Sequence, residues 1–192
     1  MAERIKNKTE NEPVSEKTSE KKENNMRKIA IEKVVLSVGG VAGELEKGVL
    51  LLKIIGENQK VSKTQSTKRI PSLGVRPGLE IGAVITIRKD MDKMLKRLLS
   101  SVNNKLSRKQ ISTNNFSFGI HEYIEILGIE YQREIGIKGL DVTVVFKRSG
   151  RRVRLRKIKR GKIPLRQVIT RKEIIKFMED NFGTEFHGKV KD

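Results

Sequence analysis

The sequence predicts an α+β fold, a mainly antiparallel sheet with helices packed on one face, together with a basic loop and a basic arm. Short segments with period-two alternation recur along the chain, at 29–38, 81–87, 116–118 and 140–147. Segments with helical spacing of apolar residues lie between and after them. Two further segments, 60–76 and 147–172, are rich in lysine and arginine and contain no acid, so we expect them at the surface.

The composition indicates a polyanionic partner. The 192 residues include 42 lysines and arginines and 23 aspartates and glutamates, a formal net charge of +19. This excess implies nucleic acid, an anionic membrane surface or an acidic protein as the partner. No apolar run approaches the length of a membrane span, and the absence of cysteine excludes disulfides and thiolate chemistry. We therefore expect a soluble chain with no membrane partner.

Residues 1–26 predict a disordered charged tail, and residues 27–192 predict a single domain. The first 25 residues contain six basic and six acidic side chains and almost nothing apolar, a composition typical of disorder. They lack the apolar stretch of a secretory signal, and their acids argue against a transit peptide. A chain of this length has room for one domain with a core of useful size.

Ile29–Val38 alternates as a strand and continues into the glycine-rich segment GGVAGE. A glycine-rich turn between a strand and a helix invites a nucleotide-binding interpretation, but these glycines match neither GxGxxG nor GxxxxGK[ST]. The helix that follows, from about Glu44 to Ile55, has apolar residues at helical spacing and stops at Gly56. We expect this helix to pack on the core, and a nucleotide-dependent enzyme stays an alternative.

Lys60 to Arg76 predicts a surface loop in contact with phosphates. It holds five basic residues, no acid and almost no periodicity, whereas a solvated loop usually tolerates some acids. Ile81–Ile87 then alternates as a strand. Asp90 is expected to cap a helix over 91–102, whose methionines and leucines follow the helical period.

Two further strands are predicted in the second half of the chain. Residues 116–118 alternate and meet Gly119, which indicates a short strand ending in a turn. Residues 140–147 present one wholly apolar face and one mixed face, as a half-buried strand does. Gly136 and Gly139 lie between these strands, where we expect a close approach of two backbone segments.

Lys147 to Lys172 is the strongest indication of RNA binding, because it contains thirteen basic residues and no acid. Arg152, Arg154 and Arg156 alternate with aliphatic residues, so an extended backbone would place them on one face. Like charges at this density repel one another in the free protein, and phosphates would relieve that repulsion. The segment 170–182 then predicts a last helix that starts with a capping box and ends at a glycine.

The sequence contains few candidate catalytic residues. His121 and His187 have no arrangement of serine, cysteine or carboxylate around them that resembles a triad or a metal site, and the acids are scattered. Aromatic residues are sparse, so folded RNA held through phosphates, sugars and shape fits better than stacked single strands. We therefore predict no enzymatic activity and no cofactor.

Several segments together resemble one known family. They are LSVGG (36–40), LGVRPGLEIGAVITIR (73–88), NFSFGI (115–120), HEYIEILGIEY (121–131), IGIKGLDVTVVFKR (135–148) and RRVRLRK (151–157). Their spelling, order and approximate spacing closely resemble the universal large-subunit ribosomal protein family called L5 in bacteria and L11 in eukaryotes, in its eukaryotic or archaeal type. The resemblance covers most of the chain.

The resemblance implies a structural role in the central protuberance of the large ribosomal subunit, where the family holds 5S rRNA against the large-subunit rRNA. It implies further partners: a neighbouring 5S-binding ribosomal protein, the P-site tRNA, which the basic loop reaches, and a protein of the small-subunit head. It also implies localisation on cytoplasmic ribosomes, with a nuclear and nucleolar assembly phase.

The predicted RNA-binding residues combine family positions with the cations of the loop and the arm. By resemblance, Gln59 and Thr86 stand where family members touch 5S rRNA, whereas Ser37 and Leu73 replace the usual Asn and Phe. The full set is Ser37, Gln59, Lys60, Lys63, Lys68, Arg69, Leu73, Arg76, Thr86, Arg88, Arg148, Arg151, Arg152, Arg154, Arg156, Lys157, Lys159, Arg160 and Lys162. A free-standing basic RNA-binding or chaperone protein would share every charge argument and stays open as the alternative.

Overall fold

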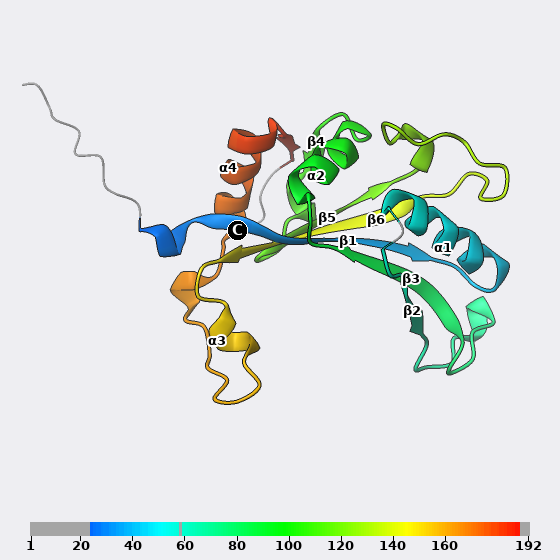
Figure 1. The fold of residues 1–192 in the computed structure, drawn as a ribbon, viewed down its shortest axis with the longest axis horizontal. Coiled ribbons are helices and arrows are strands. Elements are labelled where there is room, and N and C mark those ends of the chain that lie inside the picture. The colour runs from blue at the N-terminus through cyan, green and yellow to red at the C-terminus, as the bar shows by residue number, and fades with distance from the viewer. Residues whose placement is uncertain (1–23, 58, 189–192) are drawn as a thin grey trace, which may run out of the picture.

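A five-stranded sheet in the order β2-β3-β1-β6-β5 forms the centre of the computed structural model, which describes residues 24–57 and 59–188 (Figure 1). All neighbouring strands in this sheet are antiparallel. Its strands are β1 (Ile29–Gly39), β2 (Ser62–Gln65), β3 (Glu80–Ile87), β5 (Asn115–Ile120) and β6 (Leu140–Arg148). A separate parallel pair consists of β4 (Lys105–Ser107) and β7 (Glu185–His187).

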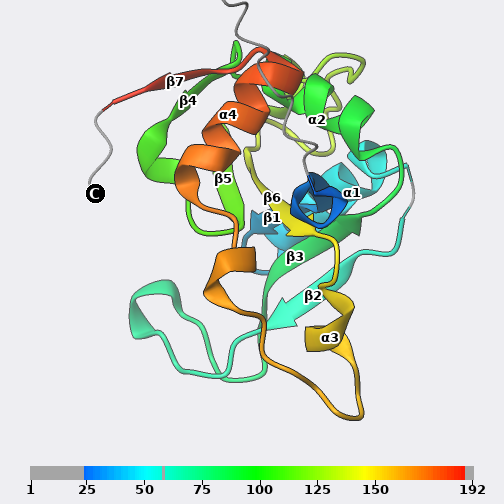
Figure 2. The ribbon, with the colours of Figure 1, turned by 90° about the vertical axis from the view of Figure 1, so that its left-hand side faces the viewer.

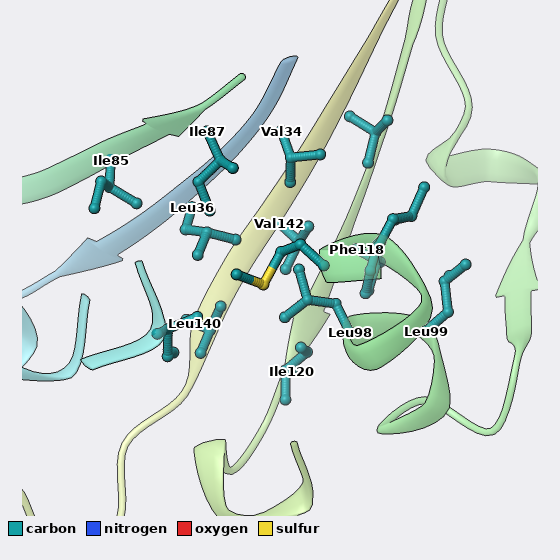
Figure 3. Packing of buried hydrophobic residues seen from close by; sticks show 14 of the residues in the cluster. Val34, Leu36, Ile85, Ile87, Leu98, Leu99, Phe118, Ile120, Leu140 and Val142 are labelled. Carbon is teal, nitrogen blue, oxygen red and sulfur yellow. The ribbon is translucent and has the colours of Figure 1, made fainter. Parts of the chain in front are cut away.

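The sheet buries one face only. Along β1, β3, β5 and β6 buried side chains alternate with more exposed ones; all of the buried ones but Arg148 at the end of β6 are apolar, and these apolar side chains share one hydrophobic cluster. The helices α1 (Gly43–Ile55), α2 (Met91–Ser100) and α4 (Arg171–Phe182) contribute their apolar residues to the same cluster, and Figure 2 shows them on one side of the sheet. Leu98 of α2 points toward Val142 and Ile120 of the sheet (Figure 3). The α+β prediction with helices on one face is confirmed.

A β-bulge in the central strand keeps two core residues on the buried face. The register of β1 against β6 shifts between Ile31 and Lys33, so Glu32 lies outside the ladder. Because of this extra residue, Ile31 and Val34 both point into the core although they are three positions apart. Glu32 is turned away from the core and accepts a hydrogen bond from Arg151.

The predicted close approach at Gly139 is confirmed. A Cβ at this position would lie 2.7 Å from the Ile120 carbonyl oxygen and 2.8 Å from that of His121. Gly136 has φ +70°, a conformation that glycine adopts at little cost. The predicted turn at Gly119 is wrong, because β5 continues through Gly119 to Ile120 while paired with β6.

The prediction of an irregular loop over Lys60 to Arg76 is partly wrong. Ser62–Gln65 forms β2, an edge strand paired with β3. Beyond it, Ser66 and Val75 are buried, and Val75 forms a β-bridge with Ile70. Every side chain of β2 is exposed, so the segment lacks the apolar alternation that identifies a strand in a sequence.

Asp90 precedes α2 but its side chain does not cap the helix, contrary to the prediction. Its backbone is left-handed, with φ 47° and ψ 36°, and its carboxylate makes no hydrogen bond to the first turn. The carboxylate instead lies 4.0 Å from the Lys93 ammonium group, and only the carbonyl oxygen accepts a bond from the helix, from Met94 N at 3.1 Å. The unusual backbone angles account for the difference, because side-chain capping needs an extended N-cap residue.

The extended arrangement considered for Arg152, Arg154 and Arg156 is wrong. Arg152–Leu155 forms the one-turn helix α3, and Arg156 N donates to Arg152 O at 3.1 Å. No strand lies beside this segment in the described part of the sheet, so local hydrogen bonds satisfy its backbone. The predicted tail over residues 1–26 lies mostly outside the described residues. Its last part enters a short 3-10 turn, Asn25–Arg27.

A buried arginine ties the end of β6 to α4. The side chain of Arg148 is 4% exposed; it donates through Nη1 to Arg166 O at 3.1 Å and through Nη2 to Glu173 Oε1 at 2.6 Å. Glu173 also accepts from the backbone N–H of Thr170 at 2.9 Å, which confirms the predicted capping box. Burial acts to raise the pKa of Glu173, but the hydrogen bonds from Thr170 and Arg148 outweigh it and leave this pKa lowered.

Replacing Glu173 with Gln should destabilise the protein by about 1–2 kcal/mol at neutral pH. Gln still accepts the cap hydrogen bonds, whereas the buried guanidinium of Arg148 loses its anionic partner. We expect a lower Tm in thermal melts followed by circular dichroism. Glu179→Gln, an exposed change of equal charge on the same helix, is the matched control.

The loss of stability in Glu173→Gln should depend on pH. Because the folded-state pKa of Glu173 is below its ordinary value of 4.5, its contribution is complete above that pH and is lost as the pH falls through the lowered pKa. The difference between wild type and Glu173→Gln should therefore narrow below about pH 4.5. A difference that persists undiminished in strong acid would show that the carboxylate charge is not the cause.

Candidate nucleic-acid interface

The face of the sheet away from the helices carries small and hydroxyl side chains. We call it the open face, and its residues are half-buried or exposed. They include Lys33, Val35 and Ser37 of β1, Ser62 of β2, Val84 and Thr86 of β3, Ser117 of β5, and Asp141, Thr143, Val145 and Lys147 of β6. Apart from Lys33 and Lys147, the side chains in this set are short, so another molecule can approach much of the backbone closely.

The register of the strands brings two predicted RNA-binding residues together. Ser37 pairs with Val84, and Thr86 lies two residues further along β3 on the same face. Ser37 and Thr86 are therefore diagonal neighbours across two hydrogen-bonded strands. Thr86 also begins a row across the sheet that continues through Val35, Thr143 and Ser117.

Sequence reasoning missed Ser117 and Thr143 as candidates. Each alternates with buried residues along a strand that had been predicted. That alternation was the available signal, because it assigns both hydroxyls to the face that does not form the core. The alternation does not show which residues are neighbours across strands, because that depends on the register between the strands.

A hairpin loop, residues 66–79, joins β2 to β3. Its base is closed by hydrogen bonds from Ser66 N to Leu79 O at 2.8 Å and from Gly78 N to Ser66 O at 2.7 Å. Lys68, Arg69 and Arg76 are exposed on it. Leu73, 65% exposed, lies in its single 3-10 turn. The hairpin loop projects to the side of the sheet opposite α1, α2 and α4 (Figures 1 and 2).

Lys63 differs from the cations of the hairpin loop. It pairs with Ala83, whose side chain faces the core, so Lys63 lies on the helix side of β2. Its Nζ donates to Glu80 Oε2 at 2.7 Å, and this hydrogen bond raises the pKa of Lys63. The charge of Lys63 is thus already partnered within the protein.

Three predicted residues flank the strands. Gln59 is half-buried and follows α1, where its backbone N–H donates to Gly56 O at 3.1 Å. Lys60 is exposed next to it, and Arg88 is exposed directly after β3.

The arm, residues 151–165, carries seven exposed cations and no acid. It contains α3 and folds back on itself, because Gly161 N donates to Val153 O at 3.1 Å. Its exposed cations are Arg152, Arg154, Arg156, Lys157, Lys159, Arg160 and Lys162. The arm projects to the same side of the sheet as the hairpin loop, so the two basic segments flank the open face (Figure 2).

Two predicted RNA-binding arginines have partners inside the protein. Arg148 is buried against Glu173 and offers almost no surface to another molecule. Arg151 is half-buried and forms an ion pair with Glu32. Burial, and then the charge of Arg154, lower the pKa of Arg151, although a guanidinium keeps its proton at physiological pH. Their carboxylate partners are distant in the sequence, which explains why a count of local charges grouped both with the exposed cations.

Residues 24–57 and 59–188 contain neither a candidate metal centre nor a helix that could span a membrane. No three histidine, cysteine, aspartate or glutamate side chains come together there in a group that could hold a metal ion. None of the helices described is long and apolar enough to cross a membrane.

Comparison with known proteins gives a consistent result. The family model that describes the C-terminus of the ribosomal protein L5 family matches residues 80–177. The large ribosomal subunit protein uL5 of Nanoarchaeum equitans is 41% identical over 85% of this chain and 98% of its own length. The proteins of the same name from Sulfolobus acidocaldarius and Pyrobaculum aerophilum are 39% and 38% identical, over 85% and 83% of this chain and 93% and 91% of their own lengths.

These matches extend over both the sheet and the arm, and they confirm the resemblance in its archaeal or eukaryotic type. The chain belongs to the ribosomal protein L5 family, the family of the large ribosomal subunit protein uL5.

Proposed function

We propose that this protein is a structural, non-enzymatic component of the large ribosomal subunit that binds 5S rRNA and large-subunit rRNA. The proteins of N. equitans and S. acidocaldarius that it resembles are named as components of that subunit. One observation carries the proposal for RNA: a hydroxyl-rich sheet face is flanked by two exposed basic segments. In this proposal, the open face contacts 5S rRNA.

The chemistry of the open face suits a folded RNA. An RNA helix displays 2′-hydroxyls and phosphates along a wide, shallow minor groove, which side chains read mainly through shape and hydrogen bonds. Ser37, Thr86 and Thr143 offer short hydroxyl groups that both donate and accept such bonds. The cations of the hairpin loop and the arm lie on either side, where they can neutralise the phosphates of a molecule seated between them.

The finer assignments follow from the family resemblance. They are a seat in the central protuberance, a neighbouring 5S-binding ribosomal protein, the small-subunit head, and a nuclear assembly phase. For contact between the hairpin loop and the P-site tRNA, the support is that Lys68, Arg69 and Arg76 project from the sheet with no acid in the segment.

A free-standing RNA chaperone is the competing proposal, and it shares the charge argument. Sedimentation of the tagged full-length protein through a sucrose gradient separates the two. We expect the protein to travel with large subunits and ribosomes. A peak confined to the top of the gradient would overturn the ribosomal role.

Binding to isolated 5S rRNA should be strongly salt-dependent. With about six phosphates neutralised, the slope of log K against log salt should be about −4 to −5. The triple variant Arg152→Gln, Arg154→Gln, Arg156→Gln should flatten it by about 2 to 3. Its Tm should stay equal or rise, because repulsion among exposed charges is relieved.

A matched control for the arm replaces Lys47, Lys53 and Lys96 with Gln, since these exposed lysines lie on α1 and α2, on the helix side of the sheet. This control should leave the salt slope nearly unchanged. Equal flattening by both triple variants would show that the arm has no particular role, and a large loss of Tm would make its arginines structural.

Removing the positive charges of the hairpin loop should show whether the loop serves ribosome assembly or tRNA binding during translation. In ribosomes with Lys68→Gln, Arg69→Gln and Arg76→Gln, we expect normal stoichiometry of the protein and several-fold faster dissociation of P-site tRNA, because up to about three phosphate contacts are lost. Lys63→Gln is the control, since Glu80 already partners that charge. Unchanged dissociation at full occupancy would remove the tRNA role, and depleted protein would assign the loop to rRNA.

A further inference from the structure

A cavity of about 570 Å³ lies where the arm returns toward the end of β6. Six cationic residues contribute to its lining: Lys147, Arg148, Arg151, Arg154, Arg160 and Lys162. Among the described residues, no aspartate or glutamate lines it. Its volume falls in the range of small-molecule sites, about 300–1,000 Å³, so it is large enough for a compact ligand but too small for an RNA helix.

The cavity carries an excess of positive charge. The guanidinium groups of Arg148 and Arg151 are paired with carboxylates outside the lining, those of Glu173 and Glu32. Arg154 and Lys162 form no ion pair with any described residue. Among the described residues, Arg160 donates only to a backbone carbonyl, Arg156 O, at 3.5 Å. Arg154 is also close enough to Arg151 to lower the pKa of its guanidinium. An anion placed among these groups would be attracted by all of them.

The cavity is also lined by apolar and amide side chains, which a site for phosphate alone would not need. Ile163 and Val168 are half-buried, and with the buried ring of Phe146 they give the cavity an apolar part. The amides of Asn114 and Gln167 also line it. Asn114 Oδ1 accepts from Ile169 N at 2.8 Å, and Gln167 Nε2 donates to Ser149 O at 2.7 Å.

These two hydrogen bonds leave one donor, Asn114 Nδ2, and one acceptor, Gln167 Oε1, without a partner in the described part of the chain. The base of a nucleotide offers apolar faces and a polar edge with both donors and acceptors, and the phosphate of the nucleotide is anionic. The cavity therefore combines the three kinds of contact that a nucleotide needs.

We propose that this cavity receives one unstacked nucleotide of the bound RNA, with its base against Ile163 and Val168 and its phosphate among Arg154, Arg160 and Lys162. The inference rests on the proposed function, since it assumes that the chain binds RNA. An unpaired nucleotide in a bulge or loop exposes both its faces and its edge, whereas a paired nucleotide does not.

The test compares three RNA duplexes of matched length: one fully paired, one with a single-nucleotide bulge, and one with an abasic residue at the bulge. The bulge is prepared with each of the four bases. Each duplex carries a fluorescent label, and its anisotropy is followed as the full-length protein is added at fixed salt, which gives the Kd of each duplex. We expect at least one bulged duplex to bind about tenfold tighter than the paired duplex, and the abasic duplex to lose that preference.

Two triple variants on the same arm locate the preference. Arg154→Gln, Arg160→Gln, Lys162→Gln removes the cationic rim of the cavity and should bring the ratio of the two Kd values close to one. Arg152→Gln, Arg156→Gln, Lys157→Gln removes equal charge from arm residues outside the cavity lining. This control should weaken binding of all duplexes by a similar factor and keep the ratio.

The outcomes separate this inference from the proposed function. Salt-dependent binding of all duplexes with no preference would overturn the nucleotide cavity and leave the RNA-binding role intact, whereas no binding to these duplexes or to 5S rRNA would overturn both. Equal affinity for the abasic and intact bulges would reduce the site to a phosphate contact and overturn base insertion. Adenosine monophosphate binding as tightly as bulged RNA would assign the cavity to a free nucleotide instead.

Discussion

Burial of one face of the sheet determines where everything else in this structure lies. The side chains of Val34, Leu36, Val142 and Val144 are fully buried, and each such residue contributes about 1.5–3 kcal/mol relative to an exposed position. Because the apolar residues of four strands point the same way, α1, α2 and α4 all pack on that side. The opposite face is then left uncovered by α1, α2 and α4 and carries mostly short side chains, and the hairpin loop and the arm flank this face.

The fold separates its structural arginines from its exposed ones. Arg148 and Arg151 are held by carboxylates, one at the start of α4 and one at the bulge of β1. The remaining cations of the arm extend into solvent, where water and salt screen their mutual repulsion. Placing the highest charge density outside the packed core limits the electrostatic cost of folding a chain with a net charge of +19.

The sequence predicted the elements that bury apolar residues at a regular period, and it failed where structure depends on distant partners. The strands of Ile29–Gly39 and Leu140–Arg148 and the helix Arg171–Phe182 were recognisable because their alternation or helical spacing records which side is buried. By contrast, β2 has no buried side chain, and β4 pairs with β7, about 80 residues later in the chain. The family resemblance selected Ser37 and Thr86, but only the strand register shows that they are neighbours.

The position of β1 in the middle of the sheet has a consequence for how the chain folds. Its two neighbours are β3 and β6, and the ladder with β6 pairs Ile29 with Arg148, residues at opposite ends of the sheet-forming sequence. Contacts between residues so far apart in sequence form slowly, because the chain between them must lose conformational entropy before the contacts can stabilise it. On a translating ribosome, β1 therefore emerges well before its partner β6, and the sheet can be completed only after residue 148 has emerged.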